Sequence, residues 1–528
     1  LDGYPVSARP AGWAYRARRF VGRHRLGVGM TALALGALLA TLGVALWQRQ
    51  EAVAARAVAE QQRAQAQQRF AQVRQLANQL VFKYHDQIEN LPAAGKVREA
   101  LLTDAAGFLD NLRQSADGDM ALAVELAGTY YRISRLQGID QSVNTGQHAA
   151  ARANLDKALA LSATYATRPD VPMAALFEAV NMRTSHGEVF QRRGEMARAD
   201  AALRAGLPLL DAALARDPKD SYALGAAISL HGVHARILGN QLAHASLGRW
   251  QDACASTDRA RAAAEATLAA DPANNYAPDS LAFTLGEQAH CRGMAGQPEA
   301  ALALLVQQQG LRERMVAKFP DDQDFLWQRA RNRAEMALVL SALGRHAEAL
   351  DQWTTADRQA RAVAAADPGN VAAQRRLVSL SLMQARLLAA AGQAASARSA
   401  VRQVLDRLPA PDPASTAFAD LQPRADALLW AARLWRDADA RQALAWAEAA
   451  AGLMAPPPAG DDNASRRWLQ AQAEGEAAAA LAALGRTADA ALRARAALAT
   501  WDAVPGLALP PLLQPARAQA ARLAGAGG

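Results

Sequence analysis

The stretch DFLWQRARNRAEMALVLSALGRHAEAL, residues 324–350, contains the pattern that decides the fold of this 528-residue chain. Its first part places small and apolar side chains three or four residues apart, the spacing of one face of an α-helix. They are Leu326, Trp327, Ala330, Ala334, Ala337, Leu338 and Ser341. Gly344 then permits the left-handed conformation that ends a helix, and the small Ala349 lets a second helix pack closely on the first. The stretch predicts two antiparallel helices joined by a tight turn.

The same glycine recurs along the chain with an alanine five residues later. The turn glycines are Gly146, Gly194, Gly248, Gly296, Gly344, Gly392 and Gly485, at spacings of 48, 54, 48, 48, 48 and 93 residues. The last interval has room for a degenerate copy with Ala438 in place of glycine and Ala443 after it. Segments that contain a helix-ending proline begin 23 residues after four of the glycines, at Asp217, Asp271, Phe319 and Asp367. We therefore expect an all-α fold, with an α-solenoid of helix pairs and a C-terminal cap over residues 120–528.

The repeated motif LGRxxEAL…A…ADP resembles the tetratricopeptide repeat, with glycine, alanine and terminal proline in that family's order. The resemblance covers roughly residues 120–503. The period of 48 exceeds the 34 residues of the family, so each helix is longer by about two turns, and the first helices lack the usual Trp and Tyr pattern. The resemblance implies a surface that binds a protein or peptide.

Residues 26–47 form a run of 22 residues without a charge. As a helix at about 1.5 Å per residue this run spans about 33 Å, close to the hydrocarbon thickness of a bilayer. A signal peptide and a buried core helix are the alternatives. Signal-peptide apolar regions are shorter, at about 7–15 residues, and a core helix would show a polar face. We therefore predict a transmembrane helix that contacts membrane lipid.

Arginines on the two sides of this run predict its orientation. Six precede it and three follow it within a comparable distance: Arg9, Arg16, Arg18, Arg19, Arg23 and Arg25 against Arg49, Arg56 and Arg63. The richer side stays in the cytoplasm. We expect a single-pass inner-membrane protein with residues 1–25 as a cytoplasmic basic segment, 48–119 as a helical stalk or linker, and the repeats outside the membrane, in the periplasm.

One face of the apolar run consists of small residues, Ala32, Gly36, Ala40 and Gly43. This small-xxx-small pattern lets two membrane helices approach closely and indicates a possible homodimer through the membrane helix. In so alanine-rich a chain the pattern also arises without that role, and both interpretations stay open.

Charge and motifs exclude several classes of function. The formal net charge is +8, of which residues 1–25 carry +5, from six arginines and Asp2, so the other 503 residues carry only +3. So small a positive charge does not indicate a nucleic-acid-binding surface, and we expect no nucleic-acid partner. The sequence has no phosphate loop, HExxH, CxxC or serine nucleophile elbow, so we expect no catalytic residue and no cofactor. His231 and His234, followed by His244, have no carboxylate nearby in sequence; we expect no metal, with the histidines facing solvent or lining a groove.

The two cysteines predict one possible disulfide. Cys254 lies six residues after Gly248 and Cys291 five residues before Gly296. In a stack of antiparallel pairs, the start of one helix meets the end of the next, which places both sulfurs at the same level. The alternative is that both are small buried side chains on faces that never meet.

The beginning of the chain carries a second resemblance. LDGYPVSARPAGWAYRARRFVGRHR, residues 1–25, the membrane span and LANQLVFKYHDQIENLP, residues 76–92, together resemble bacterial membrane-anchored serine/threonine protein kinases C-terminal to their kinase domain. The chain itself has no HRD, DFG or Gly-rich loop, so no catalytic residue carries over. The resemblance implies the sensor and interaction region of such a kinase, with the catalytic domain upstream or on another chain. A membrane-tethered repeat scaffold without a kinase is the alternative; an enzyme or small-molecule binder has no support in the residues.

Overall fold

The computed structural model describes residues 12–88, 95–113, 119–139, 147–272, 274, 277–366, 371–411, 415–455, 461–503 and 508–525. Within these residues, the side chains of most of 54–101 and of 371–375 are not described. Gly146 and the Asp367-Pro368 pair therefore lie outside the described residues. The chain divides into two compact units, residues 1–101 and 102–528.

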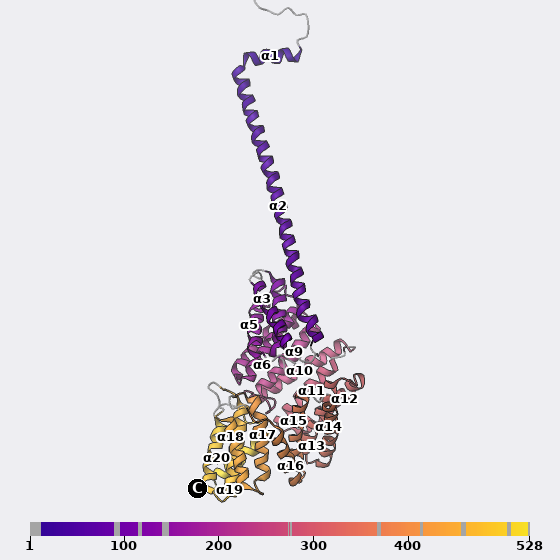
Figure 1. The fold of residues 1–528 in the computed structure, drawn as a ribbon, viewed down its shortest axis with the longest axis vertical. Helices are drawn as coiled ribbons and strands as arrows, with labels where there is room; N and C mark the ends of the chain where they lie inside the picture. The colour runs from indigo at the N-terminus through magenta and orange to yellow at the C-terminus, as the bar shows by residue number, and fades with distance from the viewer. Residues whose placement is uncertain are drawn as a thin grey trace, which may run out of the picture. The chain divides into compact units, whose positions relative to one another are not determined.

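The first unit contains α1 (Trp13–Arg23) and the 64-residue α2 (Arg25–Ile88) (Figure 1). The segment Arg25–Val58 of α2 is long and apolar enough to cross a membrane, with a mean hydropathy of 2.0, and none of its apolar window is buried. Leu26 and Leu33, for example, are 85% and 76% exposed. These side chains belong to no protein core, so the structure gives no support to the core-helix alternative.

The second unit consists of helices, and its described residues include no strand. It begins within α3 (Gly95–Arg113), whose Leu102, Ala106, Leu109 and Leu112 are buried. The helices that follow are α4 (Met120–Ser134), η1 (Arg135–Ile139), α5 (His148–Tyr165), α6 (Met173–Arg192), α7 (Met196–Arg204), α8 (Leu207–Arg216), α9 (Ser221–Leu238), α10 (Trp250–Ala270), α11 (Ala277–Met294), α12 (Pro298–Lys318), α13 (Gln323–Ala342), α14 (His346–Ala366), α15 (Val371–Ala390), α16 (Ala394–Arg407), α17 (Phe418–Trp435), α18 (Ala440–Met454), α19 (Ala464–Ala483), α20 (Thr487–Asp502), η2 (Pro511–Leu513) and α21 (Gln514–Gly525). The prediction of an all-α solenoid is confirmed.

The turn between α13 and α14 shows how each pair is built. Gly344 has φ +76°, and the N–H of Arg345 donates to the carbonyl of Leu340 at 2.9 Å, which closes the end of α13. The same left-handed conformation occurs at Gly194, Gly248, Gly296, Gly392 and Gly485. The alanine five residues beyond the turn is at most 2% exposed in every copy, at positions Ala151, Ala199, Ala253, Ala301, Ala349, Ala397, Ala443 and Ala490. A larger side chain at these positions would push the two helices apart.

The interval from Gly194 to Gly248 is six residues longer than the others, and the structure places the extra length in a loop. α9 ends at Leu238, ten residues before the turn glycine Gly248, whereas α11 and α13 continue to two residues before their turn glycines. The loop 239–249 is therefore an insertion after a first helix that has the same length as α11, 18 residues. Residues of this loop contact the C-terminal repeats and line one side of the cavity described below.

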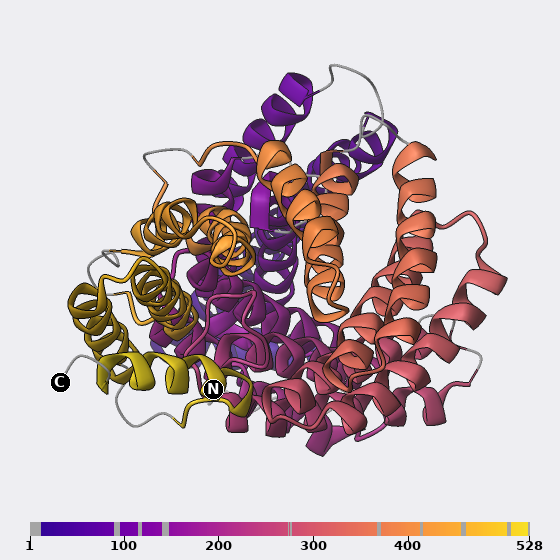
Figure 2. The same ribbon diagram turned by 90° about the horizontal axis from the view of Figure 1, so that it is seen from below.

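The solenoid turns back on itself. One hydrophobic cluster combines Phe190 and Leu203 of early helices with Phe418, Leu429 and Leu469 of late ones. Figure 2 shows the orange and gold C-terminal helices beside the purple early helices. The repeats thus form a closed arrangement in which α17 and α19 contact α6, α7 and α9, which the sequence did not predict.

Candidate functional site

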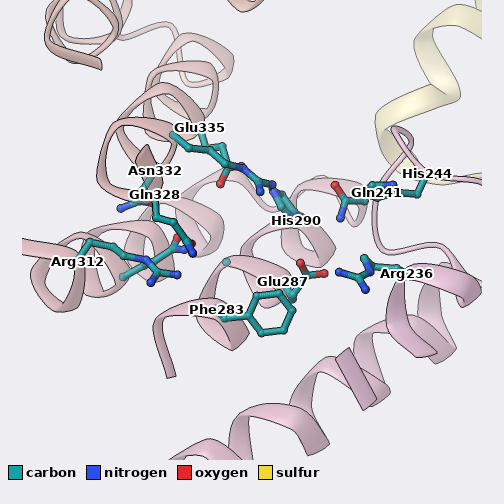
Figure 3. A pocket seen from close by; sticks show the side chains of 13 residues that line it. Arg236, Gln241, His244, Phe283, Glu287, His290, Arg312, Gln328, Asn332 and Glu335 are labelled. Carbon is teal, nitrogen blue, oxygen red and sulfur yellow. The ribbon is translucent and has the colours of Figure 1, made fainter. Parts of the chain in front are cut away.

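A cavity of about 90 Å³ lies among α9, α11, α12, α13 and the loop 239–249 (Figure 3). We call it the α11–α13 cavity. Its lining comes from residues three or four apart on helices, which share a face: Phe283, Gly286, Glu287 and His290 of α11; Gln308 and Arg312 of α12; Gln328, Arg331, Asn332 and Glu335 of α13; Arg236 of α9; and Gln241 and His244 of the loop. Almost all of these side chains are polar or charged, so the cavity is built for a polar occupant.

Each arginine that lines the cavity has a carboxylate partner within the chain. The Arg331 Nε donates to Glu335 Oε1 at 2.8 Å, and His290 Nε2 lies 3.4 Å from the same oxygen. The Arg312 guanidinium pairs with Asp279, and Arg236 lies 2.9 Å from Glu188. Glu287 accepts a hydrogen bond of 2.5 Å from Asn240 Nδ2. An occupant therefore needs no negative charge to neutralise these arginines.

Burial and these ion pairs shift the pKa values of the side chains that line the cavity. Burial alone would raise the pKa of Glu335, but the charges of Arg331 and His290 outweigh burial and lower this pKa to about 2. Burial opposes the charged form of His290, yet the neighbouring Glu335 raises the pKa of His290 above its usual value. Burial, together with the charge of Arg236, lowers the pKa of His244 to about 3. The wall formed by α11 and α13 thus holds a charged pair, while the loop side is neutral.

A register shared by three repeats supplies the acidic residues. Glu287, Glu335 and Glu476 each lie nine residues before a turn glycine. Each contacts the preceding helix pair: Glu287 accepts from Asn240, Glu335 lies by His290, and Glu476 accepts from Arg433 Nε at 2.9 Å. This recurrence was visible in the sequence but was not part of the sequence prediction.

Four polar atoms around the cavity have no hydrogen-bond partner among the described residues. They are Oε1 of Gln308, Nε of Arg312, Oδ1 of Asn332 and Nδ1 of His290. Gln308 is 8% exposed, and Arg312 and Asn332 are each 1% exposed. Figure 3 shows Arg312, Gln328 and Asn332 at one end of the cavity and Gln241 and His244 at the other.

The expectation that His231 and His234 face solvent or line a groove is wrong. Both are buried, at 8% exposure, and Nε2 of His234 lies 2.7 Å from Oδ1 of Asp200, a carboxylate 34 residues away in sequence. Burial lowers the pKa of His231 to about 4. His244 instead lines the cavity. In the part of the chain that the structure describes, no group of three His, Cys, Asp or Glu side chains is placed to hold a metal ion.

The structure joins Cys254 of α10 to Cys291 of α11 in a disulfide. The two Cα atoms are 5.5 Å apart, within the usual range for such a bond. The bridge fastens two successive helix pairs next to the cavity, since Cys291 follows the lining residue His290.

The loop 239–249 also binds the C-terminal repeats. Ser246 N–H donates to Asn463 Oδ1 at 3.1 Å, Ala464 N–H donates to the carbonyl of Ser246 at 2.7 Å, and the Ser246 and Ser465 hydroxyls are 2.8 Å apart. Trp250 Nε1 donates to the carbonyl of Ala508 at 2.9 Å. The segment that lines the cavity is thus the segment that closes the solenoid.

A second contact of the closure caps a helix from across the molecule. Oδ1 and Oδ2 of Asp462 accept from the N–H groups of Met196 and Ala197, each at 2.7 Å, at the start of α7. Free N–H groups at a helix N-terminus favour a carboxylate. The neighbouring Asp461 forms a buried ion pair of 2.9 Å with Arg466.

No protein-family model matches the chain, and no curated protein matches it. Among solved structures, it is similar to a tetratricopeptide repeat protein from Parabacteroides merdae, with 13% identity and a TM-score of 0.31 over 65% of this chain and 98% of that one. It is also similar to the apo form of RapI, with 11% identity and a TM-score of 0.41 over 85% and 97% of the two chains. A human IFIT1 dimer with PPP-AAAA is similar at 13% identity and a TM-score of 0.34 over 85% and 93%.

These likenesses are too distant to carry an argument about function. The fold assignment rests on the helix pairs, the left-handed turn glycines and the buried alanines described above. Residues 102–528 accordingly form a solenoid of tetratricopeptide-like helical repeats, in which successive helix pairs stack on one another.

Proposed function

We propose that residues 102–528 bind a protein or peptide while the apolar part of α2 anchors the chain in a membrane. The observation that carries this proposal is the exposed apolar surface of Arg25–Val58, on the same chain as a unit made of helical repeats. Water solvates such a surface at a cost of about 25 cal/mol per Å², which lipid removes. The repeats then offer partners a binding surface on a membrane-tethered chain.

We further propose that the chain is the sensor region of a bacterial serine/threonine protein kinase. Support comes from the resemblance of residues 1–25 and 76–92 to the region that follows the kinase domain in that family. The arginine excess before the span favours a cytoplasmic N-terminus and extracytoplasmic repeats. A partner outside the membrane would then bias the pairing of kinase domains inside, with Ala32, Gly36, Ala40 and Gly43 as the helix contact.

Two measurements test these proposals. A reporter active only outside the cytoplasm, fused after Gly528, should be active, whereas a cytoplasmic readout would overturn the sensor proposal. The same fusion with Arg16, Arg18, Arg19, Arg23 and Arg25 replaced by glutamine is the control, because it removes the charge bias and should reduce the reporter signal. An in-frame kinase domain in the coding sequence upstream of Leu1 would support the kinase proposal, and its absence would favour the membrane-tethered scaffold.

A further inference from the structure

The α11–α13 cavity has more hydrogen-bonding capacity than the chain itself uses. Each buried polar atom without a partner costs about 1–3 kcal/mol. Native structures keep few such atoms, and each calls for an explanation. Three of them, on Gln308, Arg312 and Asn332, belong to side chains that are more than nine-tenths buried and line one cavity. Together they offer a polar ligand two acceptors and one donor.

The contacts within the chain determine which atoms of these three side chains stay unused. Asn332 Nδ2 donates to the carbonyl of Leu305 at 3.1 Å and to Gln309 Oε1 at 2.7 Å, so its Oδ1 remains as an acceptor. The Arg312 guanidinium is held by Asp279, which leaves its Nε–H as a donor. Gln308 rests on Gly286, where an added Cβ would lie 2.8 Å from Gln308 Nε2.

The unused atoms select the charge of the ligand. A carboxylate has acceptors only and would face the oxygens of Gln308 and Asn332 without a proton between them. An ammonium or guanidinium group has donors only, so it would leave the Arg312 Nε–H unsatisfied and would add a positive charge beside that guanidinium. Arg312 and Arg331 are already paired with Asp279 and Glu335. A neutral group with both donors and an acceptor matches the unused atoms.

We propose that this cavity binds a primary carboxamide, the side chain of an Asn or Gln residue in the polypeptide that the solenoid holds. The carboxamide NH₂ donates to Gln308 Oε1 and Asn332 Oδ1, and its carbonyl accepts from Arg312 Nε. A volume of about 90 Å³ accommodates the few heavy atoms of this group, since one water needs only about 10–15 Å³ on the same measure. The choice of a polypeptide as the source rests on the proposed function; the choice of a carboxamide rests on the cavity alone.

The first experiment uses the full chain in nanodiscs and three probes of similar size: propionamide, propionate and propylammonium. Ligand-observed saturation-transfer NMR, with empty nanodiscs as the blank, should show saturable binding of propionamide alone. Gln308→Leu should weaken that binding about tenfold, because it removes one buried hydrogen bond. Gln307→Leu, the same change at the exposed neighbouring position, should leave it unchanged.

Stability separates a binding role from a structural one. Gln308 Oε1 accepts no hydrogen bond from the described residues, so Gln308→Leu should keep or raise the melting temperature while it lowers binding. Gly286→Ala supplies a second variant, since its Cβ displaces the Gln308 amide and should also weaken propionamide binding. Equal binding of propionate or propylammonium, or unchanged propionamide binding in both variants, would overturn the carboxamide assignment.

A peptide array probed with the full chain tests the source of the carboxamide. Bound peptides should lose signal when one Gln is changed to Glu or one Asn to Asp, near-isosteric changes that remove the NH₂. Peptides that bind regardless of these changes and of Gln308→Leu would overturn the inference and leave the proposed function standing. Propionamide binding with no peptide binding would overturn the polypeptide source, and with it the proposed function.

Discussion

Replacing Gly248 by alanine should open the closed solenoid, and replacing Gly344 should not. Both glycines occupy the same position of their repeats, with φ of +73° and +76°. A Cβ at Gly344 would have no neighbour within 4 Å, whereas a Cβ at Gly248 would lie 2.8 Å from Cη2 of Trp468 and 2.8 Å from Cβ of Ala464. Both substitutions therefore place an alanine in the left-handed backbone region, but only Gly248→Ala creates a steric clash with α19.

The difference between the two costs follows from the packing. Alanine in the left-handed region costs about 1–2 kcal/mol, which is the whole expected effect of Gly344→Ala. Gly248→Ala adds about 1–3 kcal/mol of overpacking, because the new Cβ would lie 2.8 Å from the ring of Trp468, a side chain that is only 2% exposed. The expected total for Gly248→Ala is about 2–5 kcal/mol.

Hydrogen exchange of the full chain in nanodiscs measures this difference by region. Gly344→Ala should lower protection in α13 and α14 only. Gly248→Ala should lower protection on both sides of the closure, in the loop 239–249 and in the first turns of α19, by about five- to 150-fold beyond the shared backbone effect. Equal and purely local losses in the two variants would refute the closed arrangement.

Three further predictions concern other contacts of the folded unit. Asp462→Ala removes both acceptors at the start of α7 and should cost about 2–3 kcal/mol of local stability in α7, read as faster amide exchange there. Glu335 has a pKa lowered to about 2 in the folded chain, so the stability that it contributes is present above its unfolded pKa near 4.5 and is lost as pH falls from there toward 2. In Glu335→Gln the melting temperature should therefore depend less on pH over that window than it does in the wild type. Changing Cys254 and Cys291 together to alanine opens a link of 37 residues and should lower stability by about 4 kcal/mol in chain-entropy terms, while free-thiol labelling of the unreduced wild type at both positions would contradict the bond.

The repeat architecture was predictable because each rule behind it is local. A glycine that ends one helix and an alanine five residues later act within a single turn, and the structure places every such described alanine in the core. The degenerate copy follows the same rule, since α17 ends at Trp435, α18 begins at Ala440 and Ala443 is buried. Local geometry survives the substitution of Ala438 for glycine because the N–H groups of Ala438 and Asp439 both donate to the carbonyl of Trp435.

The closure was not predictable from the same pattern. It depends on the small rotation between successive helix pairs, which accumulates over many repeats and leaves no periodic signature in the sequence. The hydrogen bonds that fix it join residues far apart, such as Met196 and Asp462, 266 positions away. Two irregularities were visible in the sequence: the six extra residues before Gly248 and the polar segment Asp461–Asn463. Each breaks the repeat, and the structure brings them together.

The cavity was missed for a different reason. Catalytic and metal-binding sites leave characteristic spacings in a sequence, whereas this site consists of amides, arginines and glutamates spread over four helices and a loop. A comparison of equivalent repeat positions would have singled out Glu287 and Glu335, because buried carboxylates at a helical interface need partners. It would not have shown Gln308 or Arg312, whose roles depend on how α12 is placed against α11.

The loop 239–249 links the cavity to the closure. Gln241 and His244 line the cavity, and Ser246, two residues beyond His244, exchanges hydrogen bonds with Asn463 and Ala464. In an open solenoid each repeat contacts only its neighbours, so an effect at α11 would fade along the stack. Here the loop connects α11 directly to α19. A ligand that binds the closed arrangement more tightly than the open one stabilises the closed arrangement by the difference between its two binding free energies. Closing the solenoid strengthens ligand binding by the same free energy. Gly248→Ala should therefore weaken binding in the cavity although Gly248 does not line it, and Gly344→Ala should not.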